Sequence, residues 1–200
     1  IAEAGDLDYV MQALQLTKKG LDERVPLIGF AGAPWTIFAY MIEGSGSKTF
    51  SKAKQFLYTE PELSHMLLDK ITKSTINYLK GQVASGADLI QLFDSWAGVL
   101  SEKMFYEFSL AYMSQICDAL SPLVPVTVFA KDAHYAVSKI SETSCSAIGL
   151  DWTIDPLQAR KQSATKTLQG NADPCLLYAS DNKIISETRA MLQLFGKEKY

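Results

Sequence analysis

Five short apolar runs along the chain each end in a tight cluster of Gly, Asp, Trp, Asn or Lys, and this repetition limits the possible folds. The runs with their clusters occupy residues 26–35, 89–98, 126–134, 147–152 and 167–174. Each run has the length of a buried strand, and the intervening segments have the length and pattern of helices. In parallel α/β proteins, ligands gather at the carboxyl ends of the strands. The sequence therefore predicts where a site lies before it indicates what the site does.

Strands and helices are expected to alternate along the whole chain. We predict strands over 27–30, 89–93, 126–130, 147–150 and 167–169, and helices over 6–19, 36–42, 61–84, 102–120 and 181–195. Shorter helices are expected after His134 and from Pro156, Asp6 is the expected cap of the first helix, and Gly20 is its expected end. The segment 44–47 has the composition of a flexible loop, and its position near a strand end makes it a candidate lid.

This alternation predicts an α/β fold, and the number of strands suggests which one. A closed (β/α)₈ barrel needs about eight strands and about 250 residues. We therefore interpret residues 1–200 as a single domain, an incomplete TIM barrel with about five of the eight β/α units. An open doubly wound sheet is the alternative, but its G-x-G-x-x-G signature is absent. Because the chain begins at Ile1 and ends shortly after Gly196, we expect it to be part of a longer protein.

Composition and charge exclude several classes of function. A hydrophobic content of 48% supports a sizeable core, and the net charge of −3 comes from acidic and basic residues that are mixed along the chain. Cys117, Cys145 and Cys175 form no C-x-x-C pair, which argues against a disulfide framework and against a structural zinc site. No apolar run approaches the ~18 residues of a membrane span. We therefore expect a soluble, cytoplasmic protein that binds neither nucleic acid nor a membrane.

The first two clusters carry the strongest candidates for ligand contact. Trp35 is either a ligand contact or a packing residue, and the Tyr40 phenol either donates a hydrogen bond to a ligand or packs on its helix. The succession of carboxylate, hydroxyl and indole at Asp94, Ser95 and Trp96 predicts ligand contact by at least one of them. Because no G-x-S-x-G surrounds Ser95, we interpret it as a hydrogen-bond partner and not as a nucleophile.

The later clusters are chemically more ambiguous. Lys131, Asp132 and His134 could form an acid/base set, but we favour an ion pair with Asp132 as a helix cap. Asp151 either binds ligand or ties neighbouring loops together, and this choice stays open. For Asn171, Asp173 and their neighbours, the turn chemistry favours a structural role. His65 is expected at the surface, and the two histidines match no H-E-x-x-H motif, so a catalytic metal has little support.

Seven stretches, taken in order, resemble one known family. They are 29–36, 40–44, 86–88, 91–98, 129–132, 149–152 and 168–174, which read GFAGAPWT, YMIEG, GAD, QLFDSWAG, FAKD, GLDW and LQGNADP. Together they resemble the uroporphyrinogen decarboxylase family of heme biosynthesis. Any single stretch is a weak signal, but the combination is specific and covers almost the whole chain.

The resemblance implies a (β/α)₈ barrel, a homodimer, and a reaction without metal or organic cofactor. In that reaction the four acetate arms of uroporphyrinogen III lose carbon dioxide, which gives coproporphyrinogen III. Tyr40 and Ser95 match family positions that contact the tetrapyrrole substrate, and Phe30 and Phe93 match an apolar wall beneath the macrocycle. No catalytic residue is assigned, because the family's arginine-rich motif and key Asp lie upstream of this chain and its Gly-His-Gly motif lies downstream.

Two consequences follow for the isolated chain. Its three arginines are few for a substrate with eight carboxylates, and a partial barrel leaves strand edges unpaired. We therefore expect residues 1–200 alone to be inactive. The alternatives are a zinc-dependent methyltransferase of the same superfamily, acting on a corrinoid or a thiol, and a non-catalytic ligand-binding barrel. An upstream arginine motif with its Asp favours the decarboxylase over the binding protein.

Overall fold

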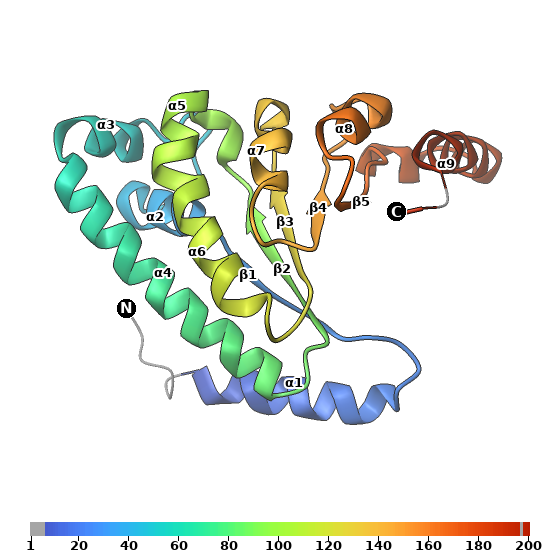
Figure 1. The fold of residues 1–200 in the computed structure, drawn as a ribbon, viewed down its shortest axis with the longest axis horizontal. Helices are drawn as coiled ribbons and strands as arrows, with labels where there is room; N and C mark the ends of the chain where they lie inside the picture. The colour runs from blue at the N-terminus through green and yellow to red at the C-terminus, as the bar shows by residue number, and fades with distance from the viewer. Residues whose placement is uncertain (1–6, 197) are drawn as a thin grey trace.

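The structure, a computed structural model, describes residues 7–196 and 198–200. Its five strands are all parallel and lie side by side in the order in which they occur along the chain (Figure 1). The strands are β1 (Ile28–Gly32), β2 (Leu89–Asp94), β3 (Val126–Ala130), β4 (Ala147–Gly149) and β5 (Thr167–Gln169). Sequential order is that of a (β/α)₈ barrel, whereas a doubly wound sheet reverses its order at a switch point. The predicted α/β fold, an incomplete barrel, is confirmed.

Helices connect the strands and pack on the sheet. They are α1 (Asp8–Leu21), α2 (Pro34–Glu43), α3 (Ser51–Thr59), α4 (Pro61–Ala84), α5 (Glu102–Phe105), α6 (Ala111–Leu120), α7 (Val137–Ser141), α8 (Pro156–Gln162) and α9 (Asp181–Phe195). A π-helical turn, Tyr106–Leu110, joins α5 to α6, and short 3₁₀ turns occupy Ala97–Val99, His134–Ala136 and Pro174–Tyr178. Within the described ranges, none of these helices has both the length and the apolar character that crossing a membrane requires.

Several predicted boundaries are confirmed, and others differ. The strand β1 covers 28–32 where 27–30 was predicted, α2 covers 34–43 where 36–42 was predicted, and the helix predicted over 102–120 is interrupted by the π-helical turn. The helices α4 and α9 and the strands β3 and β5 have the predicted limits. The expected cap Asp6 lies outside the described residues, and α1 continues past Gly20 to Leu21, where Asp22 adopts a left-handed conformation with φ 50°. The helix α3 was not predicted, because the glycine-rich segment before it suggested only a loop.

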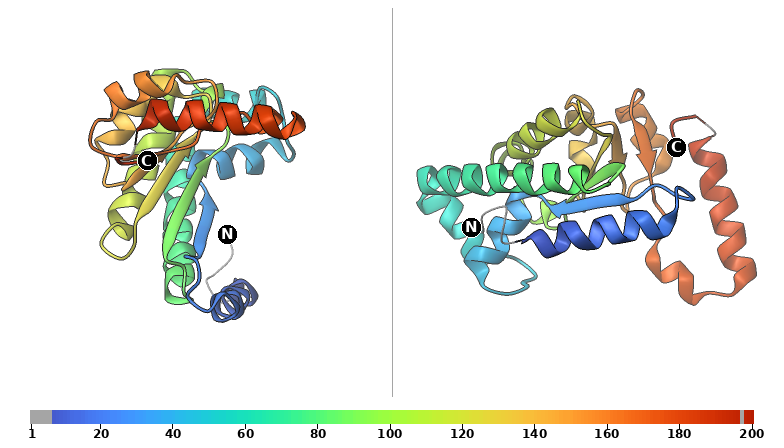
Figure 2. Two further views of the ribbon diagram at one scale, coloured as in Figure 1. Left: turned by 90° about the vertical axis from the view of Figure 1, so that its right-hand side faces the viewer. Right: turned by 90° about the horizontal axis from the view of Figure 1, so that it is seen from below.

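The two faces of the sheet differ, and this difference creates the site. The helices α4, α6 and α7 pack against β1 to β4, and in β1 Gly29 and Ala31 are buried. Ile28 and Phe30, on the other face, are 46% and 61% exposed. We call this second face the open face; Figure 2 shows the helix layer beside the strands from two further directions.

An amide on α4 holds the first strand against the helix layer. The Gln82 side chain accepts from the Phe30 backbone N–H and donates to the Phe30 carbonyl, both at 2.9 Å. Gly29 makes room for this contact, since a Cβ there would lie 2.5 Å from Gln82 Oε1. Because Gln82 is buried, its side-chain amide would have no hydrogen-bond partners without these two bonds.

Candidate functional site

An apolar cavity of about 570 Å³ lies on the open face of the sheet. Phe30, Phe93 and Phe129 line it, and their rings meet edge-on with centroids 6.1 Å apart for the first pair and 5.9 Å for the second. Gly149 leaves room beside them, because a Cβ there would lie 3.1 Å from Phe129 Cδ2. The two phenylalanines predicted to form an apolar wall therefore line one cavity. Phe129 is a third member that the sequence did not single out.

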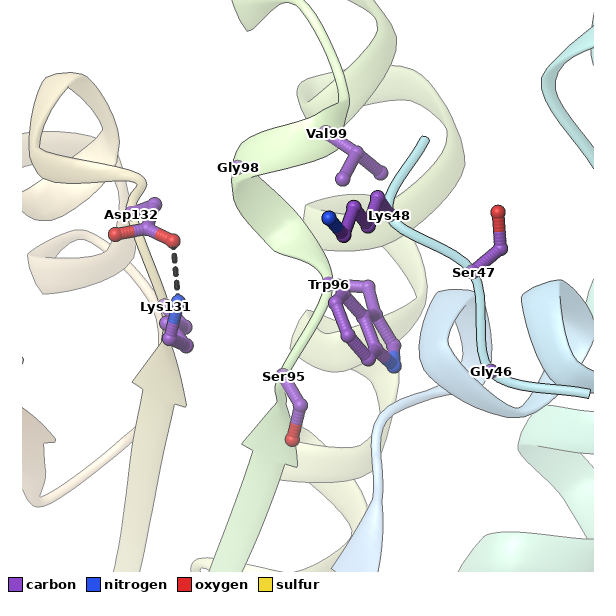
Figure 3. A pocket seen from close by; sticks show the side chains of 9 residues that line it. All are labelled: Gly46, Ser47, Lys48, Ser95, Trp96, Gly98, Val99, Lys131 and Asp132. Carbon is purple, nitrogen blue, oxygen red and sulfur yellow. Dashed lines mark hydrogen bonds and ion pairs between the residues drawn. The ribbon is translucent and has the colours of Figure 1, made fainter. Parts of the chain in front are cut away.

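A second pocket, of about 480 Å³, lies at the carboxyl ends of β2 and β3. We call it the polar pocket. The residues that line it come from three segments (Figure 3): Ser95, Trp96, Gly98 and Val99 after β2, Lys131 and Asp132 after β3, and Gly46 to Lys48 in the loop that follows α2. The predicted candidate Ser95 thus lies in a real pocket, and the candidate lid borders it. Lys48 was not expected, because a single lysine in a flexible loop carries no signal in the sequence.

Asp94, the last residue of β2, and Ser95, which follows it, lie on different sides of the sheet. Phe93 and Ser95 line the two cavities, while Asp94 between them faces the helices and is fully buried. Thr36 Oγ1 donates to Asp94 Oδ1 at 2.6 Å, and Ser109 Oγ donates to Oδ2 at 2.5 Å. Burial raises the pKa of Asp94 to about 6, against the effect of these hydrogen bonds. Asp94 therefore ties β2 to α2 and to the π-helical turn.

Tyr40 lies beside the polar pocket in an aromatic cluster. Its ring is 43% exposed and meets Phe50 and Trp96 edge-on, with centroids 5.7 and 6.2 Å apart. Phe50 and Trp96 pack against each other with ring centroids 4.6 Å apart. Tyr40 therefore contacts Trp96, the residue that follows Ser95 in the chain. Ligand contact by Tyr40 and Ser95 stays a prediction, but the fold brings both side chains to the same strand end.

Trp35 is a packing residue. It is fully buried, and its indole Nε1–H donates to the Trp96 carbonyl at 3.0 Å. The open choice between packing and ligand contact is therefore settled for this residue in favour of packing. The hydrogen bond also fixes the backbone at the end of β2, where the polar pocket begins.

The predicted ion pair after β3 is confirmed, and the predicted helix cap is wrong. Lys131 Nζ lies 2.5 Å from Asp132 Oδ2 and 5.6 Å from the centre of the Trp152 ring. The following turn starts after Ala133 without any side-chain cap. His134 Nε2 lies 3.1 Å from the Thr153 hydroxyl, and the pairing of Lys131 with Asp132 favours the ion pair over an acid/base set.

Asp151 ties two loops together and resolves the second open choice. Its carboxylate accepts from the backbone N–H of Asp132 at 2.6 Å and of Thr153 at 2.8 Å. Burial opposes its charge, but these hydrogen bonds and that of the Thr153 hydroxyl hold the pKa of Asp151 below its usual value. Asn171 Nδ2 donates to the carbonyls of Asp151 and Ile154, which confirms its predicted structural role.

Asp173 has a structural role and His65 lies at the surface, both as predicted. The Asp173 carboxylate accepts from the Cys175 N–H at 2.8 Å and caps the 3₁₀ turn after it. The His65 side chain is 41% exposed; its ring stacks on Phe108 with centroids 4.7 Å apart, and Nδ1 lies 2.7 Å from the Tyr112 hydroxyl. In the part of the chain that the structure describes, no three His, Cys, Asp or Glu side chains gather as a metal site.

Comparison with known proteins agrees with this geometry. The family model for uroporphyrinogen decarboxylase (URO-D) matches residues 1–200. A protein named uroporphyrinogen decarboxylase from Chlorobium limicola is 50% identical to this chain, over 96% of the chain and 56% of the relative. One of the same name from Pongo abelii is 46% identical, over 98% of the chain and 56% of the relative. A third, from Christiangramia forsetii, is 47% identical over 98% of the chain and 58% of the relative. The chain thus spans about half the length of the curated relatives it matches.

A solved structure supports the fold independently. A methyltransferase from Methanosarcina mazei superimposes with a TM-score of 0.82 at 19% identity, over 92% of this chain and 55% of that one. At this identity the likeness concerns the fold alone, and the zinc-methyltransferase alternative is not favoured by the named relatives. The match over all of its residues, together with identities of 46–50% to the named relatives, shows that the chain belongs to the uroporphyrinogen decarboxylase family.

Proposed function

We propose that the protein carrying this chain decarboxylates the four acetate arms of uroporphyrinogen III to give coproporphyrinogen III, in porphyrin and heme biosynthesis. The observation that carries the proposal is an apolar cavity walled by Phe30, Phe93 and Phe129 that adjoins a polar pocket in a chain of this family. Since the chain spans about half of its relatives, the activity is proposed for the complete protein.

The two cavities suit the two parts of the proposed substrate. A tetrapyrrole presents a broad apolar ring system and a rim of carboxylates. The edge-on phenylalanines offer apolar area to the ring faces, and the Tyr40 and Ser95 hydroxyls offer hydrogen-bond donors at the strand ends. We propose these two residues as substrate contacts.

The chemistry of the substrate explains why such a site needs no cofactor. Protonation of the pyrrole carbon next to an acetate arm makes the ring an electron sink. The bond between the methylene carbon of the arm and its carboxylate then breaks, its electron pair moves into the ring, and carbon dioxide leaves. A second proton adds to the methylene carbon to make the methyl group, and the ring carbon releases the first proton, which restores the pyrrole. The protein has to stabilise the cationic ring with an anion and hold the remaining carboxylates with cations. No described residue is proposed as that anion, because Asp94 is buried among Thr36 and Ser109.

We further propose that residues 1–200 belong to one barrel domain of a homodimer in the cytoplasm. The single parallel sheet supports one domain, and the three free cysteines suit a reducing compartment. The family resemblance supports the homodimer. Sedimentation of the complete protein measures its mass, and a monomer at micromolar concentration would contradict the dimer.

The activity is tested by product analysis. The complete protein is incubated with uroporphyrinogen III without oxygen, and the products are oxidised and separated by carboxyl number. The proposal expects conversion to the four-carboxyl product, and recovery of the eight-carboxyl compound alone would refute it. Binding without carboxyl loss would favour the non-catalytic barrel. Residues 1–200 expressed alone serve as a comparison and are expected to give no product.

A further inference from the structure

The polar pocket continues the apolar cavity along two neighbouring strands. Phe93 lines the cavity and Ser95 lines the pocket, and the same step of two residues leads from Phe129 to Lys131. Ser95 and Lys131 directly follow the last residues of β2 and β3, so both strands lead from the cavity toward the pocket. A ligand whose flat apolar part covers the phenylalanines therefore extends its edge toward Ser95 and Lys131.

Two cations lie on opposite sides of this pocket. Lys131 belongs to the end of β3, and Lys48 reaches in from the loop after α2 (Figure 3). Asp132 pairs with Lys131, whereas no carboxylate of the described residues pairs with Lys48. The pocket therefore keeps one uncompensated positive charge. Lys131 also retains donor capacity, because an ammonium group carries three N–H bonds and Asp132 takes one.

The backbone holds Lys131 at the wall of the pocket. The Gly98 N–H donates to the Lys131 carbonyl at 2.9 Å. A Cβ on Gly98 would lie 2.4 Å from Asp132 Cβ, so only glycine lets the segments after β2 and β3 approach this closely. Lys48 is different, since it lies in the exposed loop and its position depends on how that loop closes.

We propose that Lys48 and Lys131 form a carboxylate-binding subsite that holds one acidic arm of a ligand lying on the phenylalanines. The Trp96 ring supplies an apolar surface for the short aliphatic part of the arm, and the Ser95 hydroxyl supplies a further donor. The subsite rests on the proposed function, which provides a flat ligand with carboxylates at its rim.

The test uses the complete protein with Lys48→Met, Lys131→Met and the double variant. Lys70→Met, on the exposed side of α4, is the control because it removes the same charge from outside the pocket. Each pocket variant is expected to raise KM for uroporphyrinogen about three- to tenfold with kcat little changed, since the lysines bind ground state and transition state alike. Lys48→Arg keeps the charge and is expected to restore KM.

Three comparisons make the result decisive. In the double variant the affinity is expected to depend less on salt than in the wild type, and KM values and salt dependence equal to those of Lys70→Met would overturn the subsite. Binding of coproporphyrinogen, which keeps only the propionate arms, separates the two sources of carboxylate: a loss of affinity in the variants indicates a propionate, and a loss confined to uroporphyrinogen indicates an acetate.

Failure of the proposed function is distinguishable from failure of the subsite. If the wild type releases no carbon dioxide, the proposed reaction fails, and the subsite is then tested by titration with uroporphyrin, which carries both acetate and propionate arms and whose fluorescence reports binding. Weaker binding by the double variant than by Lys70→Met supports the subsite in that case, and equal binding overturns it.

Discussion

Replacing the buried Asp94 by Asn tests the account of how the strand end is held. The carboxyl is fully buried and its pKa is raised from 3.8 to about 6. Between these two pH values the folded protein holds a proton that the unfolded chain has lost. The contribution of Asp94 to the unfolding free energy is therefore highest below about pH 4 and falls as the pH rises through 6. A shift of about two units corresponds to a loss of about 3 kcal/mol by pH 7.

Asn has nearly the size of Asp and cannot ionise. Its oxygen can accept from Thr36, and its amide can donate to the Ser109 hydroxyl once that hydroxyl rotates. The variant therefore lacks the pH-dependent loss. We therefore expect the unfolding free energy of Asp94→Asn minus that of the wild type to increase by about 3 kcal/mol as the pH rises from 4 to 7. Carboxylates with a lowered pKa, such as Asp151, change the unfolding free energy with pH in the opposite direction. They do so equally in both proteins, so their contributions cancel in the difference.

The measurement is urea unfolding of both proteins, followed by tryptophan fluorescence, at several pH values from 4 to 8. Asp69→Asn is the matched control, because Asp69 forms an exposed pair with Lys73 and such pairs contribute little to stability. A stability difference between Asp94→Asn and the wild type that stays constant over this pH range would refute the burial argument.

Two further results are expected. Gln82→Leu should lower the unfolding free energy, measured by urea titration, by about 2–3 kcal/mol, because it leaves the N–H and carbonyl of Phe30 without the partners that hold β1 to α4. A change below about 0.5 kcal/mol, which is typical of a neutral surface site, would show that β1 does not depend on this contact. The exposed Cys175 should react with a thiol reagent in the folded protein, whereas Cys117 and Cys145 should react only after denaturation. Burial raises the pKa of Cys117 to about 12 and also raises the pKa of Cys145. Two or three rapidly reacting thiols in the folded protein would contradict this expectation.

The sequence predicted the fold well where local signals agree with tertiary packing. Pro61 at the start of α4 and Ser85 at its end mark a long helix whose limits are confirmed, and the strands at Val126–Ala130 and Thr167–Gln169 are bounded by turn residues. The helix α3 escaped prediction because Ser51–Thr59 follows a glycine-rich loop and buries only two residues, Ala53 and Leu57. With nine residues, the segment is too short for an apolar pattern to repeat more than about twice.

The site was only partly predictable, because alternation in a strand and contacts between distant loops decide which residues face a cavity. Asp94, Ser95 and Trp96 looked like one chemical group, but one faces the helix layer and the others face the polar pocket. Phe129 becomes part of the apolar wall only when β3 pairs with β2 and places it beside Phe93. Lys48 reaches the pocket through the path of a loop, which no local pattern encodes.

The proposed function places the tetrapyrrole at the carboxyl ends of β1 to β3. A crystal structure of the complete protein with coproporphyrinogen, prepared without oxygen, tests this claim most directly. We expect one face of the macrocycle to lie against Phe30, Phe93 and Phe129, with Tyr40 and Ser95 in contact with the ligand. A macrocycle bound outside this cavity, with the three phenylalanine rings free, would contradict it.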